Sequence, residues 1–265
     1  MIGPFVDTHV HLGDAQFDAD REDTIARALE SNVGRLVEIA DNPDEWDKAI
    51  AIAKSHPNII RCSLGLHPYY ADRYDINFIP RLKAALAAAP EAVAIGEIGL
   101  DYAKTQIPHD IQRRAFSELL SAGRDWNVPL VIHCRDAYHD LVPMLKDSFP
   151  RRPDGRRFWG VVHCFSGTPA EAAACAALGF ALGADGPVTY KKNDSLREAF
   201  RAAGPDVAVL ETDCPYLPPQ SSRGKRNEPR SIPEIAAKLA EVWALPIEEV
   251  ARRTTASASA LYRWP

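Results

Sequence analysis

Residues 93–100 read Val-Ala-Ile-Gly-Glu-Ile-Gly-Leu, a short apolar run with one carboxylate, Glu97, in its middle. Its length and branched side chains predict a buried strand. Similar runs lie on both sides of it, and we expect further strands at residues 5–12, 35–40, 59–66, 130–134, 158–165, 180–183 and 207–211. Burial of so many short runs points to a sheet that is covered on both faces.

Amphipathic stretches separate these runs and predict helices, for example at residues 21–31, 44–55, 111–126, 170–178 and 196–202. Strands that alternate with helices form parallel sheets, and eight such units in about 250 residues match an α/β TIM (β/α)8 barrel. An open doubly wound sheet also fits the alternation of strands and helices, but it fits a count of eight such units less easily. Nothing divides the chain, so we expect a single domain over residues 1–265. Two last helical stretches, 233–243 and 246–261, predict the final barrel helix and a C-terminal capping helix.

The composition is that of a globular protein, with 46% hydrophobic and 25% charged residues and a net charge of −5. It excludes a disordered chain and a generally basic nucleic-acid coat. The five cysteines are odd in number and lack CxxC spacing, which argues against a disulfide framework. We see no signal peptide and no membrane segment, and expect a cytoplasmic protein. No heptad pattern or long apolar edge indicates an oligomer interface.

Ionisable residues recur where the predicted strands end. His9 and His11 share one strand face by their spacing, Glu97 interrupts an apolar strand, and three more residues end later strands: His133, His163 and Asp213. Barrel enzymes carry their chemistry at this end, and buried ionisable groups are costly unless paired or bound to metal. The set therefore predicts a metal centre.

Six ligands fit two divalent ions better than one. We assign His9, His11 and Asp213 to one ion and His133 and His163 to the other, with Glu97 shared between them. Imidazole-rich ligation suits Zn, Mn or Co, and it does not exclude Mg. Water activated by the ions, with Asp213 and Glu97 as catalytic carboxylates, predicts hydrolysis.

Seven motifs follow one another along the chain: Asp-Thr-His-Val-His at 7–11, Gly-Leu-His-Pro at 65–68, Gly-Glu-Ile-Gly-Leu-Asp at 96–101, His-Cys-Arg at 133–135, His-Cys-Phe-Ser-Gly at 163–167, Glu-Thr-Asp-Cys-Pro-Tyr-Leu at 211–217 and Arg-Gly-Lys-Arg-Asn-Glu-Pro at 223–229. In these motifs the chain resembles, over nearly its whole length, the TatD family of metal-dependent DNases within the amidohydrolase superfamily. The resemblance implies a TIM-barrel hydrolase with a two-metal site, the same six ligands and nuclease activity on DNA. Two departures stand out: Tyr69 replaces a usual histidine, and residues 255–258 read Thr-Ala-Ser-Ala.

Several other polar residues follow predicted strands and are candidates for binding substrate. His67 and Arg135 suit contacts to phosphate, and the loop after the eighth strand supplies Arg223, Lys225 and Arg226. Lys191 and Lys192 follow the seventh strand. The basic stretch 151–157 precedes the sixth strand, so we expect it at the opposite end of the barrel. Cys134, Cys164 and Cys214 each follow a proposed ligand, and strand alternation predicts that they pack between barrel and helices.

These residues favour a deoxyribonuclease, most simply an exonuclease on single-stranded DNA. A hydrolase of carboxyl esters, such as a D-aminoacyl-tRNA deacylase, would use the same activated water, and the fold cannot separate the two. A non-catalytic binding barrel is a third hypothesis, although no proposed ligand is missing.

Overall fold

A computed structural model describes residues 3–151 and 155–264 and contains one eight-stranded parallel sheet. The strands pair in sequence order: β1 (Phe5–Val10), β2 (Val33–Ala40), β3 (Ile60–Leu64), β4 (Ala92–Asp101), β5 (Leu130–Arg135), β6 (Gly160–Val162), β7 (Phe180–Ala184) and β8 (Ala208–Leu210). The ends of the sheet meet where Val10 pairs with Cys214, and the His11 N–H donates to the Cys214 carbonyl at 2.9 Å. The predicted TIM barrel is therefore confirmed.

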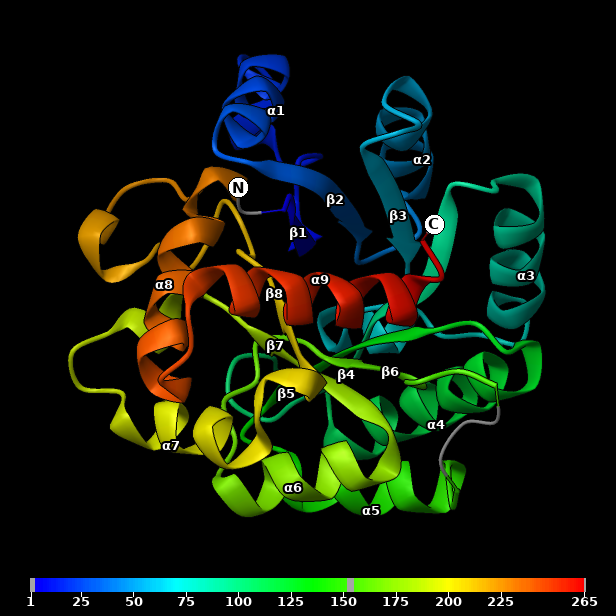
Figure 1. Cartoon of the computed structure of the whole chain (residues 1–265). Coiled ribbons are helices and arrows are strands. Elements are labelled where there is room, and N and C mark those ends of the chain that lie inside the picture. Colours follow the sequence, from blue (N-terminus) through cyan, green and yellow to red (C-terminus); the bar gives the residue numbers. More distant parts are fainter. Residues whose placement is uncertain (1–2, 152–154, 265) are drawn as a thin grey trace.

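Helices follow the strands and form the outer layer (Figure 1). They are α1 (Arg21–Glu30), α2 (Trp46–Ser55), α3 (Phe78–Ala88), α4 (His109–Trp126), α5 (Tyr138–Ser148), α6 (Pro169–Leu178), α7 (Asp194–Ala203), α8 (Ile232–Trp243) and α9 (Ile247–Tyr262). Local sequence explains their limits. In α6, for example, Thr168 and Glu171 form a capping box, and Gly179 ends the helix with φ of 90°.

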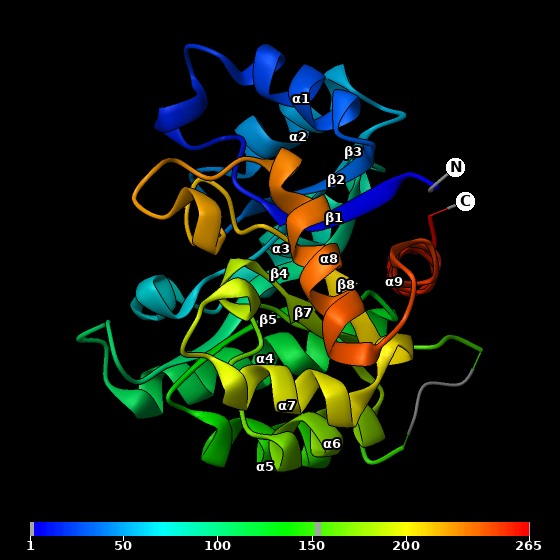
Figure 2. The same cartoon turned by 60° about the vertical axis from the view of Figure 1, so that its left-hand side comes forward.

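The last helix, α9, is the predicted C-terminal capping helix, and it closes the N-terminal end of the barrel. Its Ala258 and Leu261 join a buried cluster with Val6 of β1 and Val131 of β5. The Tyr262 hydroxyl donates to the Thr8 carbonyl at 3.3 Å. Figure 2 shows α9 on one side of the barrel, with the loops after β1 and β8 on the other. Function is thereby confined to the open, C-terminal end.

Four expected strands are longer than the observed ones. The strand expected at 59–66 is Ile60–Leu64. The strand expected at 158–165 is Gly160–Val162, that at 207–211 is Ala208–Leu210, and that at 5–12 ends at Val10. Positive φ values at Cys164 (44°) and Asp213 (56°) turn the chain away from the strand direction. Residues 152–154 of the basic stretch lie outside the described residues. Next to them, the Arg156 guanidinium stacks on Trp159 at 4.4 Å, at the end away from the proposed ligands.

Among the described residues, no helix is long and apolar enough to cross a membrane.

Candidate metal centre

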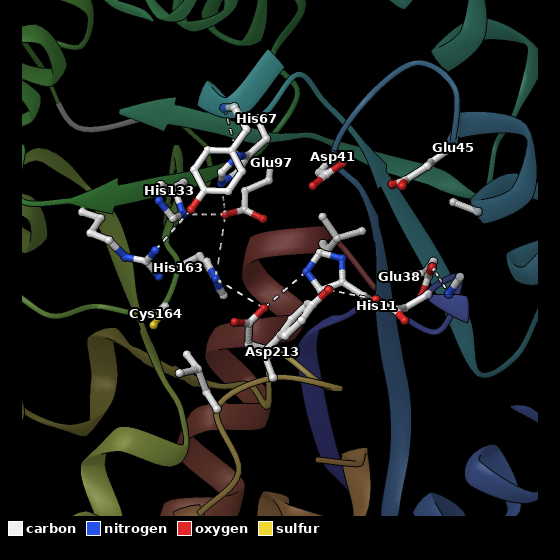
Figure 3. A pocket seen from close by; sticks show the side chains of 18 of the residues that line it. His11, Glu38, Asp41, Glu45, His67, Glu97, His133, His163, Cys164 and Asp213 are labelled. Atoms are coloured by element: carbon white, nitrogen blue, oxygen red, sulfur yellow. Dashed lines mark hydrogen bonds and ion pairs between the residues drawn. The ribbon is translucent and has the colours of Figure 1, made fainter. Parts of the chain in front are cut away.

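The structure brings all six predicted metal ligands together at the C-terminal end of the barrel. His9 lies in β1 and His11 follows it, while Glu97 and His133 lie in β4 and β5. His163 and Asp213 come from the turns directly after β6 and β8. Figure 3 shows five of the six labelled around one cavity, with dashed contacts joining them. That cavity measures about 710 Å³, a size typical of small-molecule sites.

One half of the cluster gathers His9, His11 and Asp213, whose ligand atoms lie within 4.8 Å of one another. The Nε2 atoms of His9 and His11 are 3.2 Å apart. Asp213 Oδ1 lies 3.3 Å from His11 Nε2 and 3.6 Å from His9 Nε2. These atoms are the set assigned to a single ion from the sequence.

Glu97 lies between this half and the other one. Its Oε2 is 3.3 Å from His9 Nε2, whereas its Oε1 is 2.8 Å from His133 Nδ1 and 3.9 Å from His163 Nε2. His67 also approaches Oε1, at 3.5 Å, and forms a candidate metal-binding group with Glu97 and His133. One oxygen of the carboxylate thus faces His9 and the other faces His133, as a shared ligand requires. His163 lies between the two halves, because its Nε2 is also 3.8 Å from Asp213 Oδ1.

The donor set fits a bound cation. His9 is fully buried, and its Nδ1 is a buried atom with no hydrogen-bond partner in the described part of the chain. Its ring stacks on that of His163 with centroids 3.4 Å apart. Imidazole nitrogens and carboxylate oxygens converge here within a buried space, where unpaired polar groups are costly. A divalent ion would satisfy them together.

Two carboxylates that hold the histidines were quoted in the sequence motifs but assigned no role. Asp101 Oδ2 lies 3.0 Å from His133 Nε2, and Asp101 Oδ1 accepts the N–H groups of Ala103 and Lys104 at 2.9 and 2.7 Å. Glu211 Oε1 lies 2.9 Å from His163 Nδ1. Carboxylates that bind the second nitrogen of a ligating histidine fix its ring and tautomer. The sequence held a signal for both: Asp101 is four residues after Glu97, and Glu211 is two residues before Asp213. Residues two or four apart share a strand face, so this spacing predicts that each carboxylate lies on the same face as a ligand.

Gly183 in β7 makes room for Glu211. A Cβ atom at this position would lie 2.2 Å from Glu211 Oε1, far inside contact distance. The glycine in the middle of this strand therefore leaves the space that Glu211 needs beside His163.

The carboxylates and imidazoles shift one another's pKa values. Burial disfavours the charged form of every group here, but the neighbouring histidines keep the pKa of Glu97 well below its usual value. Burial likewise opposes the imidazolium of His11, yet the Asp213 carboxylate raises the pKa of His11 to about 9. Burial and the nearby His133 lower the pKa of His67 to about 3. His67 is therefore neutral at pH 7.

Two of the predicted substrate contacts face the cavity. His67 Nδ1 accepts the Tyr69 N–H at 3.2 Å, so the proton of the neutral ring is on Nε2, which points inward. Arg135 also lines the cavity, with its guanidinium 3.5 Å from Asp101 and 3.4 Å from the Tyr69 hydroxyl. Tyr69, at the position of the family's usual histidine, is 40% exposed on the cavity wall.

The three basic residues of the loop after β8 are placed differently. Arg226 binds Asp20 and Glu228, at 2.7 and 3.0 Å, and covers the ring of Phe17. These contacts hold Arg226 in the protein body and do not support its predicted role in binding substrate. Arg223 instead lines a second hollow next to Tyr190, and Lys225 is exposed.

Cys164 departs from the predicted packing between barrel and helices. It lines the cavity, as Figure 3 shows, and its Sγ lies 3.0 Å from Asp185 Oδ2. The prediction was wrong because strand alternation does not extend past Val162, where β6 ends. Burial raises the pKa of the Cys164 thiol well above its usual value, so it is a poor nucleophile.

Comparison with known proteins agrees with this geometry. A family model described as TatD related DNase matches residues 6–263. The uncharacterized metal-dependent hydrolase YabD of Bacillus subtilis is 35% identical over 257 residues, which cover 97% of this chain and 98% of YabD. The 3'-5' ssDNA/RNA exonuclease TatD of Pantoea vagans is 33% identical over 262 residues, with 97% and 98% covered.

Among solved structures, the TatD homolog YjjV of Escherichia coli K12 superposes with a TM-score of 0.91 at 29% identity, covering 100% of both chains. A TatD family hydrolase of Entamoeba histolytica shares the fold, with a TM-score of 0.85 at 22% identity and 99% of both chains covered. The family match over nearly the whole chain and the relatives above 30% identity lead to one conclusion: this chain belongs to the TatD related DNase family.

Proposed function

We propose that this protein is a metal-dependent 3'-5' exonuclease that hydrolyses phosphodiester bonds in single-stranded DNA. The observation that carries the proposal is the convergence of four histidines and two carboxylates, Glu97 and Asp213, at the open end of the barrel. The name of the Pantoea relative, an exonuclease on single-stranded DNA and RNA, supports the choice of substrate and direction. All five cysteines are free thiols, which suits an enzyme of the cytoplasm.

The residues fit two divalent ions of Zn, Mn, Co or Mg. His9, His11 and Asp213 would hold one ion, His133 and His163 the other, and Glu97 would bind both. When bound, such ions lower the pKa of water and neutralise charge on a phosphodiester.

Asp213 would accept a proton from the attacking water. Its histidine neighbours keep its pKa below the usual value despite burial, so the group is a carboxylate at pH 7. Its side chain is 15% exposed and faces the cavity. A carboxylate in hydrogen-bond reach of the nucleophile is the geometry that general-base catalysis needs.

Arg135 and His67 would orient the phosphodiester. The Arg135 guanidinium is 39% exposed and has donors to spare beyond its long contact with Asp101. The Nε2–H of neutral His67 is a second, uncharged donor on the same side of the cavity. The exposed ring of Tyr69 offers a face on which a base can stack.

The test is cleavage of an end-labelled single-stranded oligonucleotide with added Mn²⁺ or Mg²⁺. A 5'-labelled strand should give a descending ladder, and a 3'-labelled strand should release its label first. A chelator and Asp213→Asn should each abolish both patterns. Intact DNA in the presence of bound ions would overturn the proposal, and a released 5' label would overturn the direction.

A second candidate, hydrolysis of an aminoacyl ester as in D-aminoacyl-tRNA deacylation, rests on one observation. Asp41 and Glu45 line the cavity across from His133 (Figure 3), where carboxylates can bind an α-ammonium group. Matched assays with an aminoacyl ester and an oligonucleotide separate the two. Faster turnover of the ester, reduced by Asp41→Asn, would favour the deacylase.

A further inference from the structure

A second hollow, of about 340 Å³, opens at the same end of the barrel as the metal centre. It lies between the loop after β7 and the loop after β8, which leave the barrel on its open side (Figure 2). We call it the basic hollow and define it by the residues that line it: Tyr190, Lys191, Lys192, Asn193, Gln220 and Arg223.

The two loops are tied together, so the basic hollow is preformed. Gln220 accepts the Lys191 N–H through its side-chain oxygen at 3.2 Å, and its own N–H donates to Thr189 Oγ1 at 2.8 Å. The Tyr190 hydroxyl donates to the Pro218 carbonyl at 3.0 Å, which fixes the ring.

The cations of the basic hollow form no ion pair with the residues that the structure describes. In the described part of the chain, no carboxylate lies within ion-pair distance of Lys191, Lys192 or Arg223. Arg226, three residues after Arg223, is by contrast held by Asp20 and Glu228. The protein as a whole is acidic, with a net charge of −5, so this local gathering of cations gives the hollow a positive potential that would attract an anionic partner.

An aromatic–guanidinium pair accompanies these charges. The Arg223 guanidinium lies 4.3 Å from the centre of the Tyr190 ring. Proteins that bind single strands without reading sequence combine such flat groups, on which bases stack, with cations that follow the phosphates.

The basic hollow is adjacent to the metal-centre cavity, and a wall of the chain separates the two. Pro187 and Leu217 belong to the cavity wall. Asn193 donates to the Pro187 carbonyl at 3.0 Å, and Tyr190 binds Pro218, the residue next to Leu217. A strand whose terminal phosphodiester lies at Glu97 and Asp213 therefore meets the basic hollow once it crosses this wall.

We propose that the basic hollow binds the nucleotides of a single strand that lie upstream, on the 5' side, of the bond being hydrolysed. The inference rests on the proposed exonuclease activity and adds a binding site to it. Lys191 and Lys192 contact phosphates, and a base stacks on the Arg223–Tyr190 pair. These contacts recognise the phosphates and the flat face of a base rather than base edges, so the site binds a strand of any nucleotide sequence.

Binding without cleavage tests the proposal. Fluorescence anisotropy with chelator present compares a labelled strand of about 12 thymidines, long enough for such sites, with a dinucleotide. We expect Lys191→Ala/Lys192→Ala/Arg223→Ala to weaken binding of the long strand at least tenfold, a loss of the order expected for a stacked base and its phosphates. The slope of log affinity against log salt should fall by about 1.4, from about 0.7 for each of the two lysine–phosphate contacts. Tyr190→Leu should reduce affinity without changing the slope.

Lys54→Ala/Lys146→Ala is the matched control, because both lysines are exposed at the ends of helices on the other side of the barrel. It should leave the affinity ratio of long to short strands unchanged. An equal loss in the control, or a loss that is the same for both lengths, would refute the basic hollow. If the wild-type protein cleaves DNA and the triple variant binds the long strand as tightly as the wild type does, the basic hollow is refuted and the exonuclease proposal stands. Binding that depends on these residues, in a protein that cleaves no DNA, supports the basic hollow and overturns the exonuclease.

Discussion

Asp101→Asn should weaken metal binding without unfolding the protein. In the structure Asp101 Oδ1 accepts two backbone N–H groups, from Ala103 and Lys104, and Oδ2 faces His133 Nε2 at 3.0 Å. The backbone contacts fix the amide oxygen of the new asparagine at Oδ1. Its NH2 group then takes the place of Oδ2 and faces His133.

The magnitude follows from this geometry. If His133 binds the ion through Nδ1, the atom that faces Glu97, its Nε2 carries the proton, and the variant sets two donors against each other. The lost contact is a hydrogen bond to a charged group, of about 1.5–3 kcal/mol. That range corresponds to roughly 10- to 100-fold weaker binding, the same range found for such supporting carboxylates in general.

Calorimetric titration of the chelator-treated protein with Mn²⁺ measures the effect, and thermal unfolding of the ion-free variant checks that it is folded. Asp140→Asn is a matched control, because Asp140 accepts the Tyr102 hydroxyl at 2.6 Å and does not line the cavity. Arg135→Gln removes the other partner of Asp101 and should affect substrate binding but not the ion. Unchanged Mn²⁺ affinity in a folded Asp101→Asn protein would refute the claim that Asp101 orients the ring of His133 for metal binding.

Four further outcomes follow. Asp213→Asn should lower the single-turnover cleavage rate by about 10²- to 10⁴-fold while the melting temperature stays within the wild-type range. Adding Mn²⁺ at about 100 times its Kd should raise the free energy of unfolding by about 2.7 kcal/mol. A melting temperature that is the same with and without Mn²⁺ would contradict the proposed metal centre. Gly183→Ala should displace Glu211 and weaken metal binding, whereas Gly3→Ala, where no atom lies within 4 Å of the new Cβ, should not. Burial raises the pKa of Asp185 from 3.8 to about 8, so the folded protein keeps a proton that the unfolded chain releases. The stability that Asp185 contributes is present below about pH 4 and is lost by about pH 8, so in urea unfolding of chelated protein the free energy of unfolding of the wild type minus that of Asp185→Asn should fall across this range.

The sequence was sufficient to predict the barrel and to predict that the six proposed metal ligands lie together at one end of it. Apolar runs of strand length alternate with amphipathic stretches, and this arrangement has one well-known closed solution at such a chain length. His133 and Glu97 were recognisable because an ionisable group within an apolar strand needs a reason to be there. The structure supplies that reason by bringing them within 2.8 Å of each other.

The sequence could not predict contacts that depend on distant loops. Arg226 is held by Asp20, a residue 206 positions earlier, and nothing in the local pattern distinguishes it from Arg223. Cys164 was misplaced because a turn with positive φ interrupts the alternation on which the prediction relied. Asp101 and Glu211 were visible in the motifs, but only their distances to the imidazoles reveal that they hold the rings.

The closure of the barrel by its first and last strands has a consequence for biosynthesis. His9 and His11 leave the ribosome first, yet Asp213 and the pairing of Val10 with Cys214 wait until most of the chain has been made. The covering helix α9 follows still later. A nascent or prematurely terminated chain therefore lacks a complete set of ligands, and translation itself delays the moment at which the cell holds an active nuclease.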